Sequence, residues 1–147
     1  MIRPARPEDV PKLREVFRGA VWLNRDDRAL LAEHPELLDW SATPADEGRT
    51  SVAVIDGHVI GFVSTLTHHN AVEIEDLFVA PDWMRRGVGT ALIEHVGAQA
   101  RRAGRRHLKV DANTHALEFY ARAGFVAEQK VALEHGTAIR MRLEIRE

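Results

Sequence analysis

The sequence of 147 residues contains no cysteine. This absence excludes disulfide bonds, a thiolate nucleophile, and zinc or iron–sulfur sites with cysteine ligands. No apolar run approaches the roughly 20 residues that span a bilayer, and the chain opens on a short apolar and basic segment, Met1 to Pro4. From these absences we expect a cytoplasmic protein that holds no metal and has no membrane partner.

The sequence also lacks an excess of charge of either sign. Twenty basic residues stand against 22 acidic ones, and the net charge of -2 provides no global field to attract nucleic acid. An apolar fraction of 45% and a charged fraction of 29% exclude a disordered or collagen-like chain. Because no repeat or linker divides it, we expect one domain over residues 1–147.

Hydrophobic periodicity predicts eleven secondary-structure elements, because helices repeat their apolar face every 3.6 residues and strands every second residue. In chain order they are a strand at 1–5, a helix beginning at Glu8, a helix over 26–40 that Pro35 interrupts, strands at 51–55, 58–66 and 71–79, a helix at 87–103, a strand at 107–110, a helix at 114–123, and strands at 125–133 and 139–146. Asp56-Gly57 is typical of a two-residue hairpin turn, and residues 43–48 are expected to form a loop.

The strand–helix–strand order around 87–103 implies a parallel pair inside a mostly antiparallel sheet. We therefore expect an α/β (α+β) fold with a mixed sheet of about seven strands and about four flanking helices. The final strand alternates apolar and charged residues, which indicates that one of its faces is exposed to solvent. If that strand lies at an edge of the sheet, it offers pairing to a second copy and would give a homodimer.

The segment Arg85 to Thr90 lies between a predicted strand and a predicted helix and carries Gly87 and Gly89. Glycines let a backbone approach a ligand closely, and the first N–H groups of a helix have no acceptor within the helix. Such a turn can hold an anion, and a diphosphate is the natural occupant. The alternative is that both glycines only shape a tight turn beside solvated arginines.

Two other phosphate-binding loops can be tested against this segment. The P-loop requires a lysine after its last glycine, and no lysine lies between Lys12 and Lys109, which excludes it. A dinucleotide-binding turn requires a third glycine where Leu92 stands, although Asp111 lies at a suitable distance downstream. A dinucleotide-dependent oxidoreductase therefore remains only a distant alternative.

Two sequence blocks resemble motifs of the GNAT superfamily of N-acetyltransferases, which transfer an acetyl group from acetyl-CoA to an amine. The first block runs from Ile74 through Pro81 and Gly87 to Leu92, and the second runs from Asp111 to Phe125. The order of the elements also agrees with this family along nearly the whole chain. The resemblance implies acetyl-CoA as the acetyl donor and a primary amine of a small molecule or peptide as the acceptor.

The resemblance also implies which residues bind the coenzyme. Backbone groups of Leu77, Phe78 and Val79 would pair with the amides of the pantetheine arm. The turn that would hold the pyrophosphate comprises Met84, Arg85, Arg86, Gly87, Val88, Gly89 and Thr90. Met84 departs from the family pattern, which has Arg or Gln at this position, and Arg85 and Arg86 are the neighbouring cations. Asn113 would contact the pantetheine arm, although it can equally cap the helix at 114–123.

The resemblance places a general acid at Tyr120, the only tyrosine of the chain. A phenol with a pKa near 10 stays protonated at neutral pH and can donate to a leaving thiolate. The alternative is that the Tyr120 ring only packs beside Phe119 and has no catalytic role. Glu73 and Glu75 share one face of their predicted strand, so either carboxylate, or water, can serve as base; Glu73 matches the family's glutamate best. A solvated strand face explains the two acids equally well.

The absence of cysteine favours direct attack of the amine in a ternary complex over an acetyl-enzyme. We therefore interpret the chain as an acetyl-CoA-dependent N-acetyltransferase. The alternative from another class is a non-catalytic domain that binds or senses acyl-CoA. His68 and His69 precede the strand that carries Glu73, and adjacent residues of an extended chain point to opposite sides, so they are a poor metal pair.

Overall fold

The structure is a computed structural model that describes residues 1–23, 25–134 and 136–145. The chain divides into two compact units. Unit 1 comprises Met1–Ser64 and Asp76–Leu92, and unit 2 comprises Thr65–Glu75 and Ile93–Glu147. Three elements continue from one unit into the other: the strands β3 (His58–Thr67) and β4 (Ala71–Val79) and the helix α4 (Val88–Arg102).

The strands form one sheet of seven in the order β1-β2-β3-β4-β5-β7-β6, which confirms the predicted fold class. The strands not yet named are β1 (Ile2–Pro4), β2 (Thr50–Ile55), β5 (His107–Asn113), β6 (Val126–Leu133) and β7 (Gly136–Glu144). The pair β4–β5 is parallel, whereas β1–β2, β2–β3, β5–β7 and β6–β7 are antiparallel. The parallel pair that flanks a helix is therefore present as predicted.

The helices of unit 1 follow the predicted pattern with one addition. Helix α1 (Val10–Trp22) is followed by α2 (Arg25–Glu33) and a 3₁₀ turn at Pro35–Leu38, so the proline divides the predicted helix. Residues 43–48 were expected to be a loop, but Thr43–Asp46 forms the short helix α3. Pro44 suits a first helical turn, and the Ser41 hydroxyl accepts the N–H of Thr43 at 3.2 Å, a local contact that periodicity cannot reveal.

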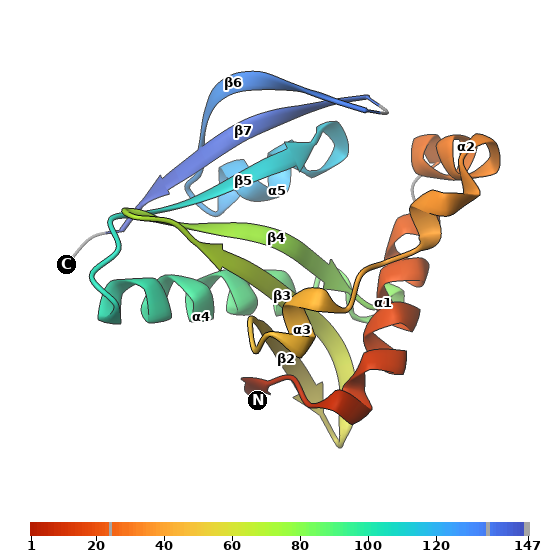
Figure 1. Ribbon diagram of the computed structural model, residues 1–147, viewed down its shortest axis with the longest axis horizontal. Helices are drawn as coiled ribbons and strands as arrows, with labels where there is room; N and C mark the ends of the chain where they lie inside the picture. Colours follow the sequence, from red (N-terminus) through yellow and green to blue (C-terminus); the bar gives the residue numbers. More distant parts are fainter. Residues whose placement is uncertain (24, 135, 146–147) are drawn as a thin grey trace. The chain divides into compact units, whose positions relative to one another are not determined.

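The core of unit 1 lies between α1 and the hairpin of β2 and β3 (Figure 1). Its central apolar cluster comprises Leu13, Val16, Trp40, Val52, Val54, Val59 and Phe62. The hairpin turn has positive φ at both Asp56 (50°) and Gly57 (78°), as the sequence predicted. At the chain start, Asp9 is buried and its carboxylate accepts the Arg3 guanidinium at 2.8 Å and the Arg6 N–H at 2.7 Å.

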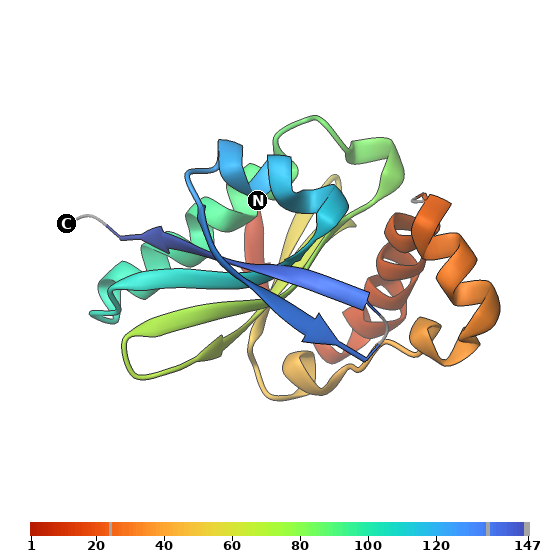
Figure 2. The same cartoon turned by 90° about the horizontal axis from the view of Figure 1, so that it is seen from above.

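Unit 2 consists of the paired strands β5, β7 and β6, the start of β4 and two helices. Helix α5 (Leu117–Arg122) lies along one face of β5 and β7 (Figure 2), and a 3₁₀ turn at Thr114–Ala116 precedes it. The buried side chains of the unit include Val96 and Ala100 of α4, Leu108 and Val110 of β5, and Met141 of β7. Gly104 and Gly124 end their helices with φ of +74° and +101°.

The position of β7 corrects one expectation. The final strand was considered as an edge strand that could pair with a second copy, but β7 lies between β5 and β6. The edge on this side of the sheet is β6, which pairs only with β7 among the described strands. The alternation of β7 reflects one face that packs Met141 and another that carries Arg140 and Arg142.

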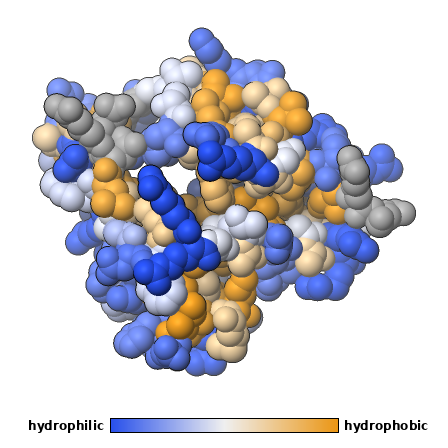
Figure 3. All heavy atoms as spheres, turned by 180° about the vertical axis from the view of Figure 1, so that it is seen from behind, coloured by the Kyte–Doolittle hydropathy of each residue, from blue (hydrophilic) through white to orange (hydrophobic). Residues whose placement is uncertain are grey.

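The described residues contain five α-helices, and none is long and apolar enough to cross a membrane. The face seen in Figure 3 mixes hydrophilic and hydrophobic residues. Large apolar side chains with substantial exposure include Trp22, Met84, Val126 and Leu133.

Candidate active site

The turn from β4 to α4 in unit 1 is the first part of the candidate site. After β4 ends at Val79, residues Pro81–Trp83 form a 3₁₀ turn and Met84 returns to extended geometry. Two residues then adopt positive φ, Arg85 at 63° and Gly87 at 82°. Helix α4 begins directly afterwards. Alternating backbone geometry of this kind turns successive N–H groups toward a common side, which is how backbone anion sites are built.

The first turn of α4 leaves backbone donors without acceptors inside the helix. The first intrahelical bond runs from the Ala91 N–H to the Gly87 carbonyl at 3.0 Å, so the N–H groups of residues 88–90 precede it. Gly87 is exposed, and a Cβ at this position would have no heavy atom within 4 Å. The positive φ, and not lack of space, therefore favours a glycine here.

Most residues of the turn are exposed. Arg85, Arg86 and Thr90 are exposed, whereas Val88 and Gly89 are half-buried. The Arg86 guanidinium lies 5.0 Å from the centre of the Trp83 ring, a cation–π contact that holds it beside the turn. Met84, where the family pattern has Arg or Gln, is 36% exposed and adds no charge. Positive potential at this turn comes from two arginines and the helix N-terminus.

The strand residues Leu77, Phe78 and Val79 lie at the end of β4 and are half-buried. The Phe78 ring packs edge-on against Phe17 with centroids 5.0 Å apart and contacts Phe62 at 5.7 Å. This packing fixes the end of β4 on the core of unit 1. In unit 2, β4 pairs in parallel with β5 from Ala71↔His107 to Ile74↔Val110, ahead of these three residues along the chain.

Gly61 of β3 is a residue that the motif analysis missed. It is buried, and a Cβ there would lie 3.1 Å from the Phe78 carbonyl oxygen and 3.1 Å from a methyl group of Val88. Gly61 thus allows the first turn of α4 to pack closely on the end of β4. A glycine inside a strand is the sequence signal for such close approach.

Tyr120 of α5 lies in unit 2 and is 6% exposed. Its ring packs edge-on against Phe119 and Phe125, with centroids 5.1 Å and 5.3 Å away. Burial raises the pKa of the phenol, so the hydroxyl stays protonated at neutral pH. Among the described residues, the hydroxyl has no hydrogen-bond partner. The ring is packed beside Phe119, as the packing alternative expects, and the protonated state is also the one that a proton donor requires.

Asn113 ends β5 and is exposed. It precedes the 3₁₀ turn at Thr114–Ala116 in extended geometry, but its side chain makes no capping hydrogen bond. Asn113 therefore stands at the N-cap position, as the capping alternative expects, but its side chain does not cap the turn. The amide remains available to a ligand.

Glu73 and Glu75 lie on β4 in unit 2. The Glu73 carboxylate is half-buried and lies 2.8 Å from Nε2 of His68. Glu75 is exposed. The contact makes His68 a neighbour of a candidate base, which sequence reasoning did not foresee because the two residues meet across the β3–β4 turn. The described residues include no group of three acidic or histidine side chains that could hold a metal ion.

The candidate residues thus divide between the two units. The residues of the turn and the end of β4, from Leu77 to Thr90, belong to unit 1. Glu73, Glu75, Asn113 and Tyr120 belong to unit 2. Within unit 1 the structure joins the predicted backbone donors in one exposed turn.

Curated relatives of the chain carry names of N-acetyltransferases. The chain is 37% identical to the uncharacterized N-acetyltransferase YafP of Escherichia coli K12 over 88% of its own length and 85% of the relative. It is 35% identical to the uncharacterized N-acetyltransferase MJ1207 of Methanocaldococcus jannaschii over 58% of its length, and spans 42% of that protein. An aminoglycoside N(6')-acetyltransferase of Stenotrophomonas maltophilia is 29% identical over 82% of the chain and 80% of the relative.

Solved structures agree with this result. A GCN5-related N-acetyltransferase of Rhodopseudomonas palustris has a TM-score of 0.77 at 28% identity, covering 98% of this chain and 94% of that one. An acetyltransferase of the GNAT family from Desulfovibrio desulfuricans shares the fold with a TM-score of 0.81 at 22% identity, covering 99% of both chains. The model of the acetyltransferase (GNAT) family matches residues 14–125. The chain therefore belongs to the GNAT family and is an N-acetyltransferase.

Proposed function

We propose that this protein transfers the acetyl group of acetyl-CoA to a primary amine of a small molecule or peptide, by direct attack in a ternary complex. The observation that carries this proposal is the exposed turn before α4, in which Gly87 has a φ of 82° and the N–H groups of residues 88–90 precede the first intrahelical bond. A diphosphate fits such a turn because it accepts several backbone hydrogen bonds and interacts favourably with the helix dipole.

The proposed coenzyme contacts extend from this turn. The N–H groups from Arg86 to Thr90 would hold the pyrophosphate, with Met84 and Arg85 at the entrance of the turn. Backbone groups of Leu77–Val79 would pair with the pantetheine amides, and Asn113 would donate to the same arm. The packing of Phe78 against Phe17 supports this role, since it fixes the strand whose backbone is used.

The proposed reaction is a single acyl transfer. The amine nitrogen attacks the thioester carbonyl carbon, a C–N bond forms, the C–S bond breaks, and the thiolate leaves. Tyr120 would donate a hydrogen bond or its proton to the thiolate; burial raises the pKa of the phenol, which keeps it protonated before the transfer and also makes it a weaker acid. The amine must lose a proton, which Glu73 or Glu75 would accept, directly or through water. The 2.8 Å contact of Glu73 with His68 offers that proton a route onward.

The acceptor is proposed as an amine on the strength of relatives. Enzymes named for aminoglycoside and streptothricin acetylation align with 82% and 63% of this chain. The structure neighbours include an N-acetyltransferase named as a complex with coenzyme A. These names support a CoA donor and a small amine as acceptor.

Release of free thiol from acetyl-CoA tests the proposal directly. The purified protein is incubated with acetyl-CoA and a panel of amines that includes aminoglycosides, a streptothricin and peptides with free N-termini. We expect amine-dependent thiol release with at least one acceptor class, and mass spectrometry should find the acetylated amine. Binding of CoA without turnover on any amine would support the non-catalytic alternative, and absence of both would overturn the proposal.

A further inference from the structure

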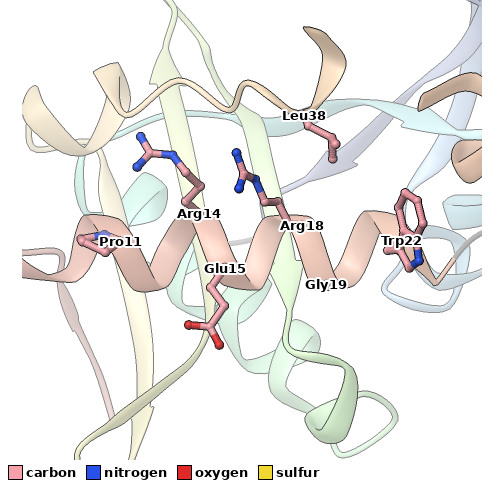
Figure 4. A pocket seen from close by; sticks show the side chains of 7 residues that line it. All are labelled: Pro11, Arg14, Glu15, Arg18, Gly19, Trp22 and Leu38. Atoms are coloured by element: carbon pink, nitrogen blue, oxygen red, sulfur yellow. The ribbon is translucent and has the colours of Figure 1, made fainter. Parts of the chain in front are cut away.

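A groove runs along α1 in unit 1 (Figure 4), and its lining includes none of the residues proposed to bind the coenzyme. Its volume is about 710 Å³, within the range of small-molecule sites. Its lining comprises Pro11, Arg14, Glu15, Arg18, Gly19 and Trp22 of α1 and Leu38 of the following 3₁₀ turn. No role in the proposed acetyl transfer has been given to any of these residues.

Two arginines give this groove its charge. Arg14 and Arg18 are four residues apart on α1 and therefore neighbours on the same helix face. Figure 4 shows both guanidinium groups on the side of Leu38, whereas the carboxylate of Glu15 points to the other side. The Glu15 carboxylate instead forms an ion pair with the Lys12 ammonium group at 3.4 Å. Within the part of the chain that the structure describes, neither arginine has a hydrogen-bond or ion-pair partner.

An apolar surface lies beside the two cations. Trp22, one turn beyond Arg18, is 54% exposed, and Leu38 faces the same groove. A partly exposed indole ring beside cations is suited to stack on an aromatic ligand. Guanidinium groups prefer carboxylates and phosphates, which they can bind with two parallel hydrogen bonds. The groove thus combines an anion-binding part with an aromatic one.

A second cavity of unit 1 has a more acidic lining than the groove. It has a volume of about 430 Å³ and lies between α1, the β2–β3 turn and the 3₁₀ turn at Pro81–Trp83. Its charged lining includes the acids Glu15, Asp56 and Asp82 and the single cation Lys12. An anion would be repelled there and attracted by the groove of Arg14 and Arg18.

We propose that the groove on α1 binds a small organic anion with an aromatic body, such as an aryl carboxylate. Arg14 and Arg18 hold the carboxylate, while Trp22 and Leu38 cover the ring. The volume of the groove selects a small molecule as the occupant. The proposal does not depend on the acetyl-transfer reaction, because the binding residues differ and binding is measured without acetyl-CoA.

Calorimetry with 2-naphthoate as the probe tests the proposal at a physiological salt concentration, which screens nonspecific attraction. We expect saturable binding with one site per chain. The uncharged analogue 2-naphthamide should bind at least tenfold more weakly, and so should 2-naphthoate to the double variant Arg14→Gln/Arg18→Gln. The variant Lys12→Gln removes one charge from the same helix outside the groove and should bind as the wild type does. Circular dichroism checks that each variant keeps its helices.

Several results would overturn the proposal. No saturable binding of 2-naphthoate, or equal binding to the double variant and the wild type, would remove the anion site. Inorganic phosphate binding as tightly as 2-naphthoate, together with no loss in Trp22→Ala, would show that the aromatic part is wrong. Weaker binding of 2-naphthoate to Trp22→Ala and weak binding of phosphate support the proposal.

Discussion

The turn before α4 in unit 1 and the surroundings of Tyr120 in unit 2 are built in opposite ways. The turn is exposed, and its proposed contacts come from backbone N–H groups whose direction depends on the positive φ of Gly87. Tyr120 is 6% exposed, and its proposed contribution comes from one side-chain hydroxyl. The difference predicts that changes in the turn alter coenzyme affinity, whereas changes at Tyr120 alter turnover.

The largest expected effect is that of Tyr120→Phe. The substitution removes the proposed proton donor, so kcat should fall by about 100-fold or more, which is the lower range for general acid catalysis. The affinity for CoA, measured by calorimetry, should stay within about twofold of the wild type. Steady-state kinetics with saturating acetyl-CoA provides the turnover number.

A stability measurement controls for a structural role of the same hydroxyl. Because the described residues offer it no hydrogen-bond partner, Tyr120→Phe should leave the free energy of unfolding unchanged within about 0.5 kcal/mol. Unchanged turnover in a stable Tyr120→Phe variant would contradict the assignment of Tyr120 as the acid.

The next effect is expected at Gly61, whose Cα lies under the first turn of α4. An added methyl group would lie 3.1 Å from the Phe78 carbonyl oxygen and 3.1 Å from a methyl group of Val88, so in Gly61→Ala these neighbours must move by a few tenths of an ångström. We expect a loss of about 1–3 kcal/mol in urea unfolding and weaker CoA binding, since the turn moves with the helix. Gly97→Ala is the matched control, because a Cβ there meets nothing within 4 Å. It should be neutral or stabilising, and equal losses in both variants would contradict the packing role.

Gly61 also marks a limit of reasoning from the sequence. The Gly87 turn was predictable, because a local motif specifies a positive φ and a helix start. Three other features were predictable from the sequence: the hairpin at Asp56-Gly57, the break at Pro35 and the parallel pair β4–β5. The first two depend on residues close together in sequence, and the third depends on the rules for connections between strands. Gly61 acts through Phe78 and Val88, at least 17 residues away along the chain. A glycine inside a strand signals a close approach, but the local pattern does not identify the residues that approach it.

The candidate acid and base show the same limit. The resemblance to a family placed Tyr120 and Glu73, but burial of the phenol and the contact of Glu73 with His68 depend on tertiary packing. Local reasoning also could not decide whether the last strand lies at an edge of the sheet, because the order of strands depends on long-range pairing. β7 was a candidate edge strand and lies inside the sheet.

The smallest expected effect is a pH dependence of stability that arises in unit 2. Desolvation lowers the pKa values of His95 and His107 from their usual 6.5. Between the lowered folded values and 6.5, the unfolded chain binds more protons than the folded one, so the free energy of unfolding rises with pH and levels off above about pH 7. His107→Gln should reduce this rise, as measured by urea unfolding at pH 5 to 8. An identical rise in the variant would contradict the assignment to His107.

The most direct test of the central claim compares CoA binding to Gly87→Ala and Gly104→Ala by calorimetry. Both glycines have positive φ, 82° and 74°, and a Cβ at either position meets nothing within 4 Å, so the backbone strain of about 1–2 kcal/mol is matched. We predict at least a tenfold loss of CoA affinity in Gly87→Ala, wild-type affinity in Gly104→Ala, and no difference between the two for pantetheine, which lacks the phosphates. Equal CoA affinity in both variants would contradict the claim that the N–H groups of this turn bind the pyrophosphate.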